Sequence, residues 1–293
     1  MVDKNSKKSV RPRLRLLPPL HAVKVFFSSL YGRNAPLKIA ASQEQIARIN
    51  RHSCRAKLPS PNRVSFLQTG SREGRRIIFI HGTPGNARGW ADYLLDVPAG
   101  LTYIALDRPG YGRSEPEHAV VSLQRQAQAV APLLTTVGNK KAILVGHSSG
   151  ASIAMQAALD NPDRVGGLLL LAGAFDPELE EVIWLQTIGA CTPISRLLSR
   201  PINNANHELL SLKRGLLAQS ERLHRISIPV TIVHGDADPL VPVANVSYLR
   251  RRLTNAELEE LVLKQVDHFL PWHSKPFIDA SLERLISRVR RTE

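Results

Sequence analysis

The segment Gly146-His-Ser148-Ser-Gly150 places a serine between two glycines in the spacing G-x-S-x-G. An aliphatic run precedes it and an alanine-rich helical pattern follows it, which predicts a tight turn from a strand into a helix. Such a turn imposes strained backbone angles on the serine, and glycines two residues away let the chain pass without a side-chain clash. The turn also points a helix N-terminus at the hydroxyl, where negative charge is stabilised. Ser148 is therefore predicted to be a nucleophile.

A serine hydroxyl attacks well only when a base takes its proton, and a carboxylate usually orients that base. Asp238 follows the predicted strand 230–233, and His268 follows the last predicted strand, 258–263. Open parallel sheets place their sites beyond the carboxyl ends of strands, so these side chains are expected to meet there. These positions predict a catalytic triad in which Asp238 orients His268 and His268 activates the serine.

Other residues near these motifs are also candidates for the acid and the base. Asp236 competes with Asp238 for the role of the acid, although an aspartate in such a loop also commonly holds the backbone of a turn. His81, His147, His234 and His273 are alternative histidines. We favour His268 because of its position after the last strand. No side-chain role is expected for His147 or Ser149, the variable residues of the turn.

The elements that must position these residues alternate short aliphatic runs with longer helical patterns. This alternation predicts the α/β class, with a parallel sheet covered by helices. The predicted strands are residues 64–69, 77–80, 103–106, 142–145, 168–171, 230–233 and 258–263, and the predicted helices lie around 122–137, 150–160, 243–253 and 276–290.

Two further segments are similar to motifs of the α/β-hydrolase family. His81-Gly-Thr-Pro-Gly85 resembles the family's H-G-x-P-G loop, and Asp107-Arg-Pro-Gly-Tyr-Gly-Arg-Ser114 resembles its D-x-x-G-x-G-x-S segment. Together with the serine turn and the order of the triad, the resemblance covers residues 77 to 271. It implies a mostly parallel, doubly covered sheet of the α/β-hydrolase type with an inserted helical cap.

The resemblance also implies roles for individual residues. The backbone N–H groups of Thr83 and Ser149 are expected to form the oxyanion hole, which needs two donors aimed at the developing charge. Similar sequences place the acid four residues after the histidine of His-Gly-x-x-Asp, which selects Asp238. Asp107 and Arg108 are expected to brace the neighbouring loop.

These elements divide the chain into three parts. Residues 1–61 are predicted to be a basic extension, residues 62–175 and 227–293 the α/β-hydrolase core, and residues 176–226 a helical cap. The cap is predicted because the interval is too long and too apolar for an ordinary connection between a helix and a strand. Trp184, within the cap, is a candidate substrate contact.

The net charge of +14 is concentrated in the N-terminal part of the chain. Residues 1–63 contain 14 Lys or Arg against two acids, whereas the remaining 230 residues contain 25 bases against 23 acids. This asymmetry argues against nucleic-acid binding as the main function and leaves peripheral contact with an anionic membrane open for the extension. No apolar run approaches the about 18 residues of a transmembrane helix. A cytoplasmic location, with or without membrane contact, is expected.

The predicted reaction is cleavage of a carboxylic ester, thioester or amide of a fairly apolar small substrate through an acyl-enzyme. Epoxide hydrolases and haloalkane dehalogenases share the fold but need a carboxylate nucleophile, and residue 148 is a serine. No metal or cofactor is expected, because no metal-ligand spacing or dinucleotide fingerprint is present. The alternatives are a cofactor-free lyase or perhydrolase with the same triad, and a ligand receptor with slow turnover. The sequence leaves the oligomeric state open.

Overall fold

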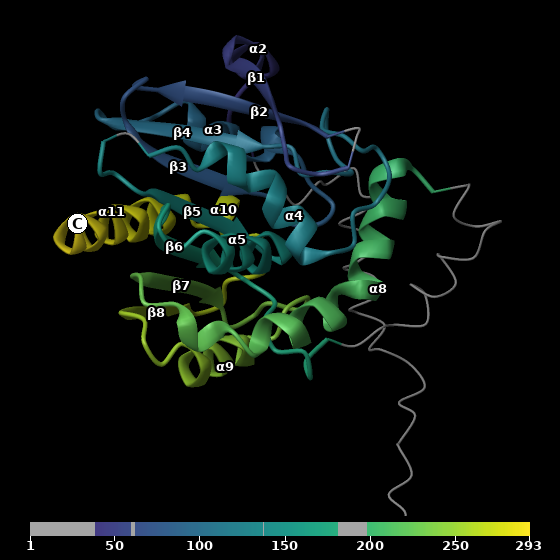
Figure 1. Cartoon of the computed structure of the whole chain (residues 1–293), viewed down its shortest axis with the longest axis vertical. Coiled ribbons are helices and arrows are strands. Elements are labelled where there is room, and N and C mark those ends of the chain that lie inside the picture. The colour runs from purple at the N-terminus through teal and green to yellow at the C-terminus, as the bar shows by residue number, and fades with distance from the viewer. Residues whose placement is uncertain (1–38, 60–61, 137, 181–197) are drawn as a thin grey trace, which may run out of the picture.

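The computed structural model describes residues 39–59, 62–136, 138–180 and 198–293. These residues form a sheet from the strands β1 (Asn50–Arg55), β2 (Arg63–Gly70), β3 (Arg75–Ile80), β4 (Leu101–Leu106), β5 (Ala142–His147), β6 (Val165–Leu171), β7 (Val230–Gly235) and β8 (Leu258–Leu263). The spatial order is β1-β2-β4-β3-β5-β6-β7-β8 (Figure 1). Strand β2 pairs antiparallel with β1 and β4, and the other neighbours are parallel. The predicted α/β class with a mostly parallel sheet is confirmed.

Seven of these strands were predicted from their aliphatic runs, and β1 was not. Strand β1 has the sequence Asn-Arg-His-Ser-Cys-Arg and is largely exposed at the edge of the sheet, so its residues lack the apolar signal of a buried strand. It lies within residues 1–61, which we assigned to the basic extension. The sheet therefore begins at Asn50, before the predicted start of the core at residue 62.

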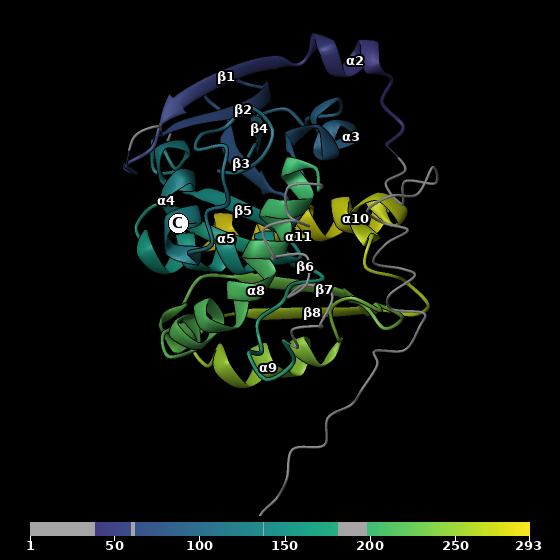
Figure 2. The ribbon, with the colours of Figure 1, turned by 90° about the vertical axis from the view of Figure 1, so that its right-hand side faces the viewer.

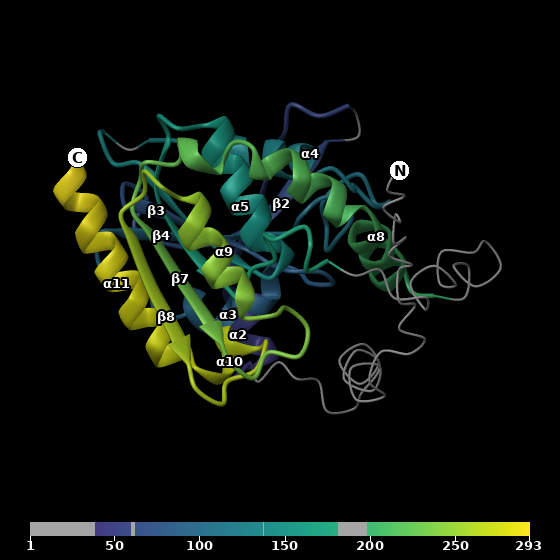
Figure 3. The same ribbon diagram turned by 90° about the horizontal axis from the view of Figure 1, so that it is seen from below.

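Helices cover both faces of the sheet (Figures 2 and 3). They are α2 (Gln43–Arg48), α3 (Ala91–Leu94), α4 (Leu123–Val130), α5 (Ser149–Asp160), α8 (Arg200–Ser220), α9 (Ala244–Arg252), α10 (Leu270–His273) and α11 (Lys275–Thr292), with short 3₁₀ turns at Ala87–Trp90, Ala131–Leu133 and Leu223–Arg225. Helices α4, α5, α8 and α9 contribute to the apolar core on one face, and α3, α10 and α11 to the core on the other.

Strand β3 illustrates why the central strands are apolar throughout. Ile78 and Ile80 belong to one core, while Ile77 and Phe79 belong to the other, and all four side chains are fully buried. A parallel strand covered on both faces must be apolar at successive positions rather than at alternate ones. The loops that follow β3, β5, β7 and β8 consequently emerge at one edge of the sheet, at its carboxyl ends.

The described part of the predicted cap, within residues 176–226, includes the 21-residue helix α8. Its Leu212 and Leu216 are buried in the same apolar core as α4 and α5. Trp184 lies outside the described residues, so its predicted substrate contact stays a prediction, as does the division into extension, core and cap. None of the described helices is long and apolar enough to cross a membrane.

Candidate active site

The serine turn joins β5 directly to α5. Ser148 has φ 55° and ψ −128°, a conformation that costs a non-glycine residue free energy and marks a constrained turn. A Cβ atom on Gly146 would overlap the backbone at Gly150 and Ala151, and one on Gly150 would overlap the carbonyl oxygens of Ile80 and His81. Both glycines are therefore required by close backbone approach, as their spacing around the serine predicted.

His268 and Asp238 are joined by a short hydrogen bond. His268 Nδ1 lies 2.7 Å from Asp238 Oδ2, and the Asp238 side chain is fully buried. The other carboxylate oxygen accepts hydrogen bonds of 2.8 Å from the backbone N–H groups of Leu240 and Val241. Because Nδ1 is engaged by the carboxylate, Nε2 is the nitrogen of His268 that is available to take a proton.

The pKa of Asp238 is lowered in spite of its burial. Burial alone would raise this pKa, but hydrogen bonds from His234 and His268 and from the backbone of Val241 favour the charged form and hold the pKa below its usual value. Asp238 is thus an anion at neutral pH. An anion in this position favours the tautomer of His268 that has its proton on Nδ1 and stabilises the imidazolium after proton transfer.

The competing acid, His234 and His273 contact groups other than His268. Asp236 Oδ1 accepts a 2.6 Å hydrogen bond from the backbone N–H of Gln265, so this aspartate holds the loop after β7. His234 Nε2 lies 2.9 Å from the carbonyl oxygen of Val241 and 3.4 Å from Asp238 Oδ2, so His234 supports the acid. His273 Nδ1 lies 3.1 Å from Asp267 Oδ1. Of the two acids, it is Asp238 that lies against His268.

His147 contacts His268 from the serine turn. The two rings lie with centroids 4.8 Å apart, and His147 Nε2 is 2.9 Å from the carbonyl oxygen of His268. Burial, followed by the nearby His268 ring, lowers the pKa of His147 to about 3, so His147 is neutral near pH 7 and donates its Nε2 proton to this carbonyl. Since His147 directly precedes Ser148, these contacts bring His268 to the serine turn. We expected no such side-chain role for His147.

The loop after β3, residues 81–85, lies against the serine turn. A Cβ atom on Gly82 would be 2.9 Å from Ser148 Cβ, so only a glycine allows this approach. His81 is buried and its Nδ1 donates to the carbonyl oxygen of Gly82 over 2.7 Å, while its Nε2 accepts from the backbone N–H of Arg108 over 3.1 Å. Thr83 follows, and its hydroxyl forms a hydrogen bond with the hydroxyl of Tyr111.

The second predicted oxyanion donor begins α5. Ser149 is the first residue of this 12-residue helix, and the first N–H groups of a helix have no partner within it. The Ser149 hydroxyl is buried and makes no hydrogen bond to any residue that the structure describes. Both the backbone N–H and the hydroxyl are thus available to a ligand at the serine turn.

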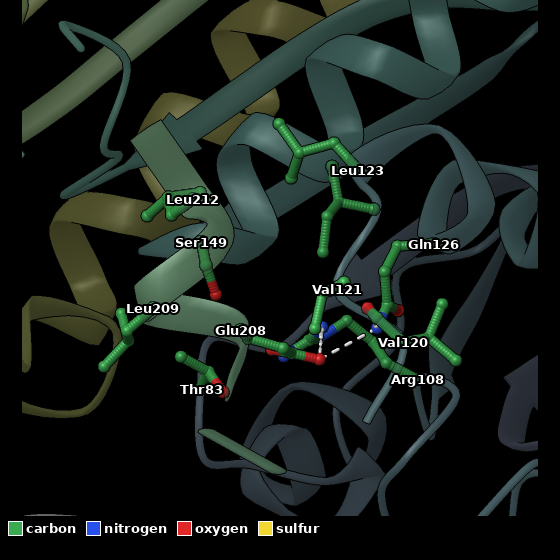
Figure 4. A pocket seen from close by; sticks show the side chains of 11 residues that line it. Thr83, Arg108, Val120, Val121, Leu123, Gln126, Ser149, Glu208, Leu209 and Leu212 are labelled. Atoms are coloured by element: carbon green, nitrogen blue, oxygen red, sulfur yellow. Dashed lines mark hydrogen bonds and ion pairs between the residues drawn. The ribbon is translucent and has the colours of Figure 1, made fainter. Parts of the chain in front are cut away.

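A small cavity lies between the serine turn, the β3 loop and α8, and we call it the cap pocket. It is lined by the polar residues Thr83, Arg108, Gln126, Ser149 and Glu208 and by the apolar residues Val120, Val121, Leu123, Ile153, Leu209 and Leu212. In Figure 4 the Ser149 hydroxyl points into the space between Thr83, Leu209 and Glu208. The cap pocket has a volume of about 20 Å³, which leaves room for roughly one water molecule.

Sequence reasoning found the triad candidates but missed two polar residues of this pocket. Glu208 and Gln126 were not singled out, although Glu208 is the one acidic residue of α8 and lies beside Leu209 and Leu210. The sequence signal that could have identified Glu208 is a single acidic residue next to apolar residues in a helix. The expected bracing role of Asp107 agrees with its contacts, since its carboxylate accepts from Arg51 and from the backbone of Ala87.

Acid should destabilise the folded chain through His81 and His147. Burial lowers the pKa of both histidines, that of His81 well below its ordinary value and that of His147 to about 3. In the unfolded chain both histidines have a pKa of about 6.5. Below this pH the unfolded chain therefore binds more protons than the folded chain. From pH 7 to pH 5 His147 should lower the free energy of unfolding by about 2 kcal/mol, and His81 should lower it further.

Urea denaturation at pH 7 and pH 5 measures this loss. His147→Gln retains an N–H donor for the carbonyl of His268 but does not titrate, so its loss of stability should be smaller by about 2 kcal/mol. An unchanged loss in this variant would show that His147 titrates alike in the folded and unfolded chains.

The comparisons with known proteins agree with this fold. Residues 75–190 match the family model described as alpha/beta hydrolase fold. A solved monoacylglycerol lipase of Paleococcus ferrophilus has a TM-score of 0.62 at 20% sequence identity, over 77% of this chain and 99% of the lipase. The chain therefore has the alpha/beta-hydrolase fold, and the resemblance predicted from the motifs is confirmed.

Two relatives by sequence are more informative about chemistry. Over 264 residues the chain is 27% identical to the 2-hydroxy-6-oxononadienedioate/2-hydroxy-6-oxononatrienedioate hydrolase of Paraburkholderia phymatum, covering 76% of this chain and 91% of the hydrolase. Over 213 residues it is 29% identical to the dihydrolipoyllysine-residue acetyltransferase component of the acetoin cleaving system of Cupriavidus necator, covering 62% of this chain but 57% of that protein. The class that these similarities support is a hydrolase of this fold.

Proposed function

We propose that the chain is a serine hydrolase that cleaves a carboxylic ester, thioester or amide with a small acyl group. The observation that carries the proposal is the 2.7 Å contact between His268 Nδ1 and Asp238 beside a constrained serine turn. Ser148 is the proposed nucleophile, His268 the base and Asp238 the acid. A binding protein would gain nothing from a buried carboxylate that orients a histidine next to such a serine.

In the proposed mechanism His268 Nε2 takes the proton of the Ser148 hydroxyl as Ser148 Oγ bonds to the carbonyl carbon. The N–H groups of Thr83 and Ser149 stabilise the negative charge that forms on the carbonyl oxygen. The leaving group departs with the proton from His268, which leaves an acyl-enzyme. Water then gives a proton to His268 and attacks the acyl carbon, and the acid is released as the proton returns to Ser148.

The cap pocket favours a short, uncharged acyl group. Its lining is largely aliphatic, and Arg108, the one cation among the described lining residues, is neutralised by a 3.0 Å ion pair with Glu208. A volume of about 20 Å³ accommodates an acetyl methyl group more readily than a long chain. The hydroxyl of Ser149, which has no hydrogen-bond partner among the described residues, offers one hydrogen bond to an acyl oxygen.

A second candidate is hydrolysis of a 2-hydroxy-6-oxo-dienedioate, because the relative from Paraburkholderia phymatum is named for such a substrate. This substrate has two carboxylates, and binding them in a buried site requires cationic partners. The described lining of the cap pocket offers only the already paired Arg108. We therefore rank ester hydrolysis first and place the dienedioate second.

Activity-based labelling and an ester series test the proposal. A fluorophosphonate probe should label Ser148, as mapped by mass spectrometry, and p-nitrophenyl esters should be hydrolysed with the highest kcat/KM for acyl chains of about two to four carbons, since longer chains overfill the pocket. A dienedioate substrate should be turned over at least about tenfold less efficiently than the best ester. Neither labelling nor turnover of any ester would contradict the proposal and favour a ligand receptor.

A further inference from the structure

Arg108 is buried beneath the β3 loop and binds two of its residues. Its side chain is 1% exposed. Its Nε–H donates to the carbonyl oxygen of His81 over 2.9 Å, and its Nη2 donates to the carbonyl oxygen of Gly82 over 3.1 Å. These are the two residues that directly precede Thr83, so Arg108 holds the backbone immediately before a proposed oxyanion donor.

The Gly82 carbonyl determines where the Thr83 N–H points. A carbonyl group and the N–H group that follows it belong to one planar peptide unit and point in opposite directions when the unit is trans. The Gly82 oxygen accepts from both His81 Nδ1 and Arg108 Nη2, at 2.7 and 3.1 Å. These two donors therefore fix the orientation of the peptide plane and with it the direction of the Thr83 N–H.

Glu208 holds Arg108 from the opposite side. Its Oε1 and Oε2 lie 3.2 and 3.0 Å from Arg108 Nη1 and Nη2, and Gln126 Nε2 donates to Oε1 over 2.9 Å (Figure 4). The guanidinium thus contacts two loop carbonyls with one edge and a carboxylate with the other. Glu208 belongs to α8, whereas the loop follows β3, so the ion pair links the described part of the predicted cap to the serine site.

The charge of Glu208 is what keeps the guanidinium in place. Burial disfavours the charged form of Arg108, but the Glu208 carboxylate, together with Tyr111, outweighs this effect and raises the pKa of Arg108. Without the carboxylate, the partners of this buried cation among the described residues would be the loop carbonyl oxygens and Tyr111, whose ring centroid lies 4.8 Å away. A buried charge that loses its counterion moves toward water or costs several kcal/mol.

We propose that Glu208 is a positioning residue for the oxyanion hole: from α8 it holds Arg108 against the Gly82 carbonyl and so aims the Thr83 N–H at the reacting carbonyl oxygen. This inference rests on the proposed function and adds to it a dependence of the chemical step on a residue of the predicted cap. Glu208 itself touches no reacting atom in this scheme.

A second Arg–Glu pair, distant from the serine site, provides a matched control for Glu208→Gln. Arg75, at the start of β3, is 4% exposed and forms a two-pronged pair with Glu293. It lies at the opposite end of the strand from the serine site. Glu208→Gln and Glu293→Gln therefore make the same change in two Arg–Glu pairs whose arginine is buried, and one of these pairs contacts the β3 loop.

The test compares kcat and KM of the two variants on the best ester, with the rate of Ser148 phosphonylation as a second readout. For Glu208→Gln we expect kcat to fall by about 10 to 100-fold with KM changed by less than about threefold, because a misaimed donor weakens transition-state binding alone. For Glu293→Gln we expect kcat within about twofold of the wild type. Equal kcat values for Glu208→Gln and wild type, or equal losses in both variants, would overturn the proposal.

The double variant Arg108→Met with Glu208→Met separates positioning from stability. It removes both charges, so its melting temperature should exceed that of Glu208→Gln. Its kcat should stay low, because the Gly82 carbonyl has still lost its Arg108 donor. A kcat that recovers together with the melting temperature would overturn the positioning role. A wild-type chain that is neither labelled nor active would instead overturn the proposed function, and this inference with it.

Discussion

Replacing Ser148 by alanine should lower kcat on the best ester by at least about 10³-fold and abolish labelling by the fluorophosphonate probe. The hydroxyl is the only atom that the change removes at the proposed point of attack, and no covalent intermediate can form without it. The serine turn itself should persist, because its glycines and the backbone contacts of β5 and α5 do not depend on the hydroxyl. The measurement is steady-state hydrolysis by purified protein.

Ser152→Ala is the matched control for this variant. Ser152 lies in α5, four residues after Ser148, and its hydroxyl donates to the carbonyl oxygen of Ala174. Loss of this buried hydrogen bond should cost about 1 kcal/mol of stability and leave kcat within about twofold. Circular dichroism checks that both variants are folded. Full activity in folded Ser148→Ala would exclude the serine as nucleophile.

The fold was largely predictable because the central strands are apolar without interruption. Runs such as Ile77–Ile80 and Leu168–Leu171 are buried on both faces, and only a doubly covered strand requires this pattern. Strand β1 could not be found in this way, because an edge strand exposed to water has a polar sequence. An exposed strand therefore lacks the apolar pattern from which the buried strands were predicted.

Within the site, residues tied to a local motif were predictable and residues tied by long-range contacts were not. The serine turn is encoded by five consecutive residues, and the order of Asp238 and His268 follows from the strands before them. The pairing of Arg108 with Glu208 joins residues 100 positions apart and has no counterpart in local spacing. The role of His147 depends likewise on a contact with the backbone of His268, which only the folded chain creates.

The resemblance selected Asp238 over Asp236 as the acid, and the 2.7 Å contact of Asp238 with His268 leads to the second large expected effect. Asp238→Asn should lower kcat by about 10³ to 10⁴-fold with a small change in KM. The asparagine oxygen would keep the hydrogen bonds from Leu240 and Val241, which bind the carboxylate at 2.8 Å. Its NH₂ group would then face His268 Nδ1 and favour the tautomer that has its proton on Nε2. That tautomer cannot accept the proton of Ser148.

Asp236→Asn is the matched change two residues earlier. Among the described residues the Asp236 carboxylate accepts a 2.6 Å hydrogen bond from the Gln265 N–H, and an asparagine oxygen can accept the same bond. Its kcat should therefore stay within about threefold of the wild type, and its melting temperature should change little. Steady-state kinetics of both variants on the same ester shows which aspartate is the acid of the triad. A larger loss of kcat in Asp236→Asn than in Asp238→Asn would assign the role of the acid to Asp236. It would mean that Asp236, which does not contact the His268 ring in the structure, determines the tautomer of this histidine.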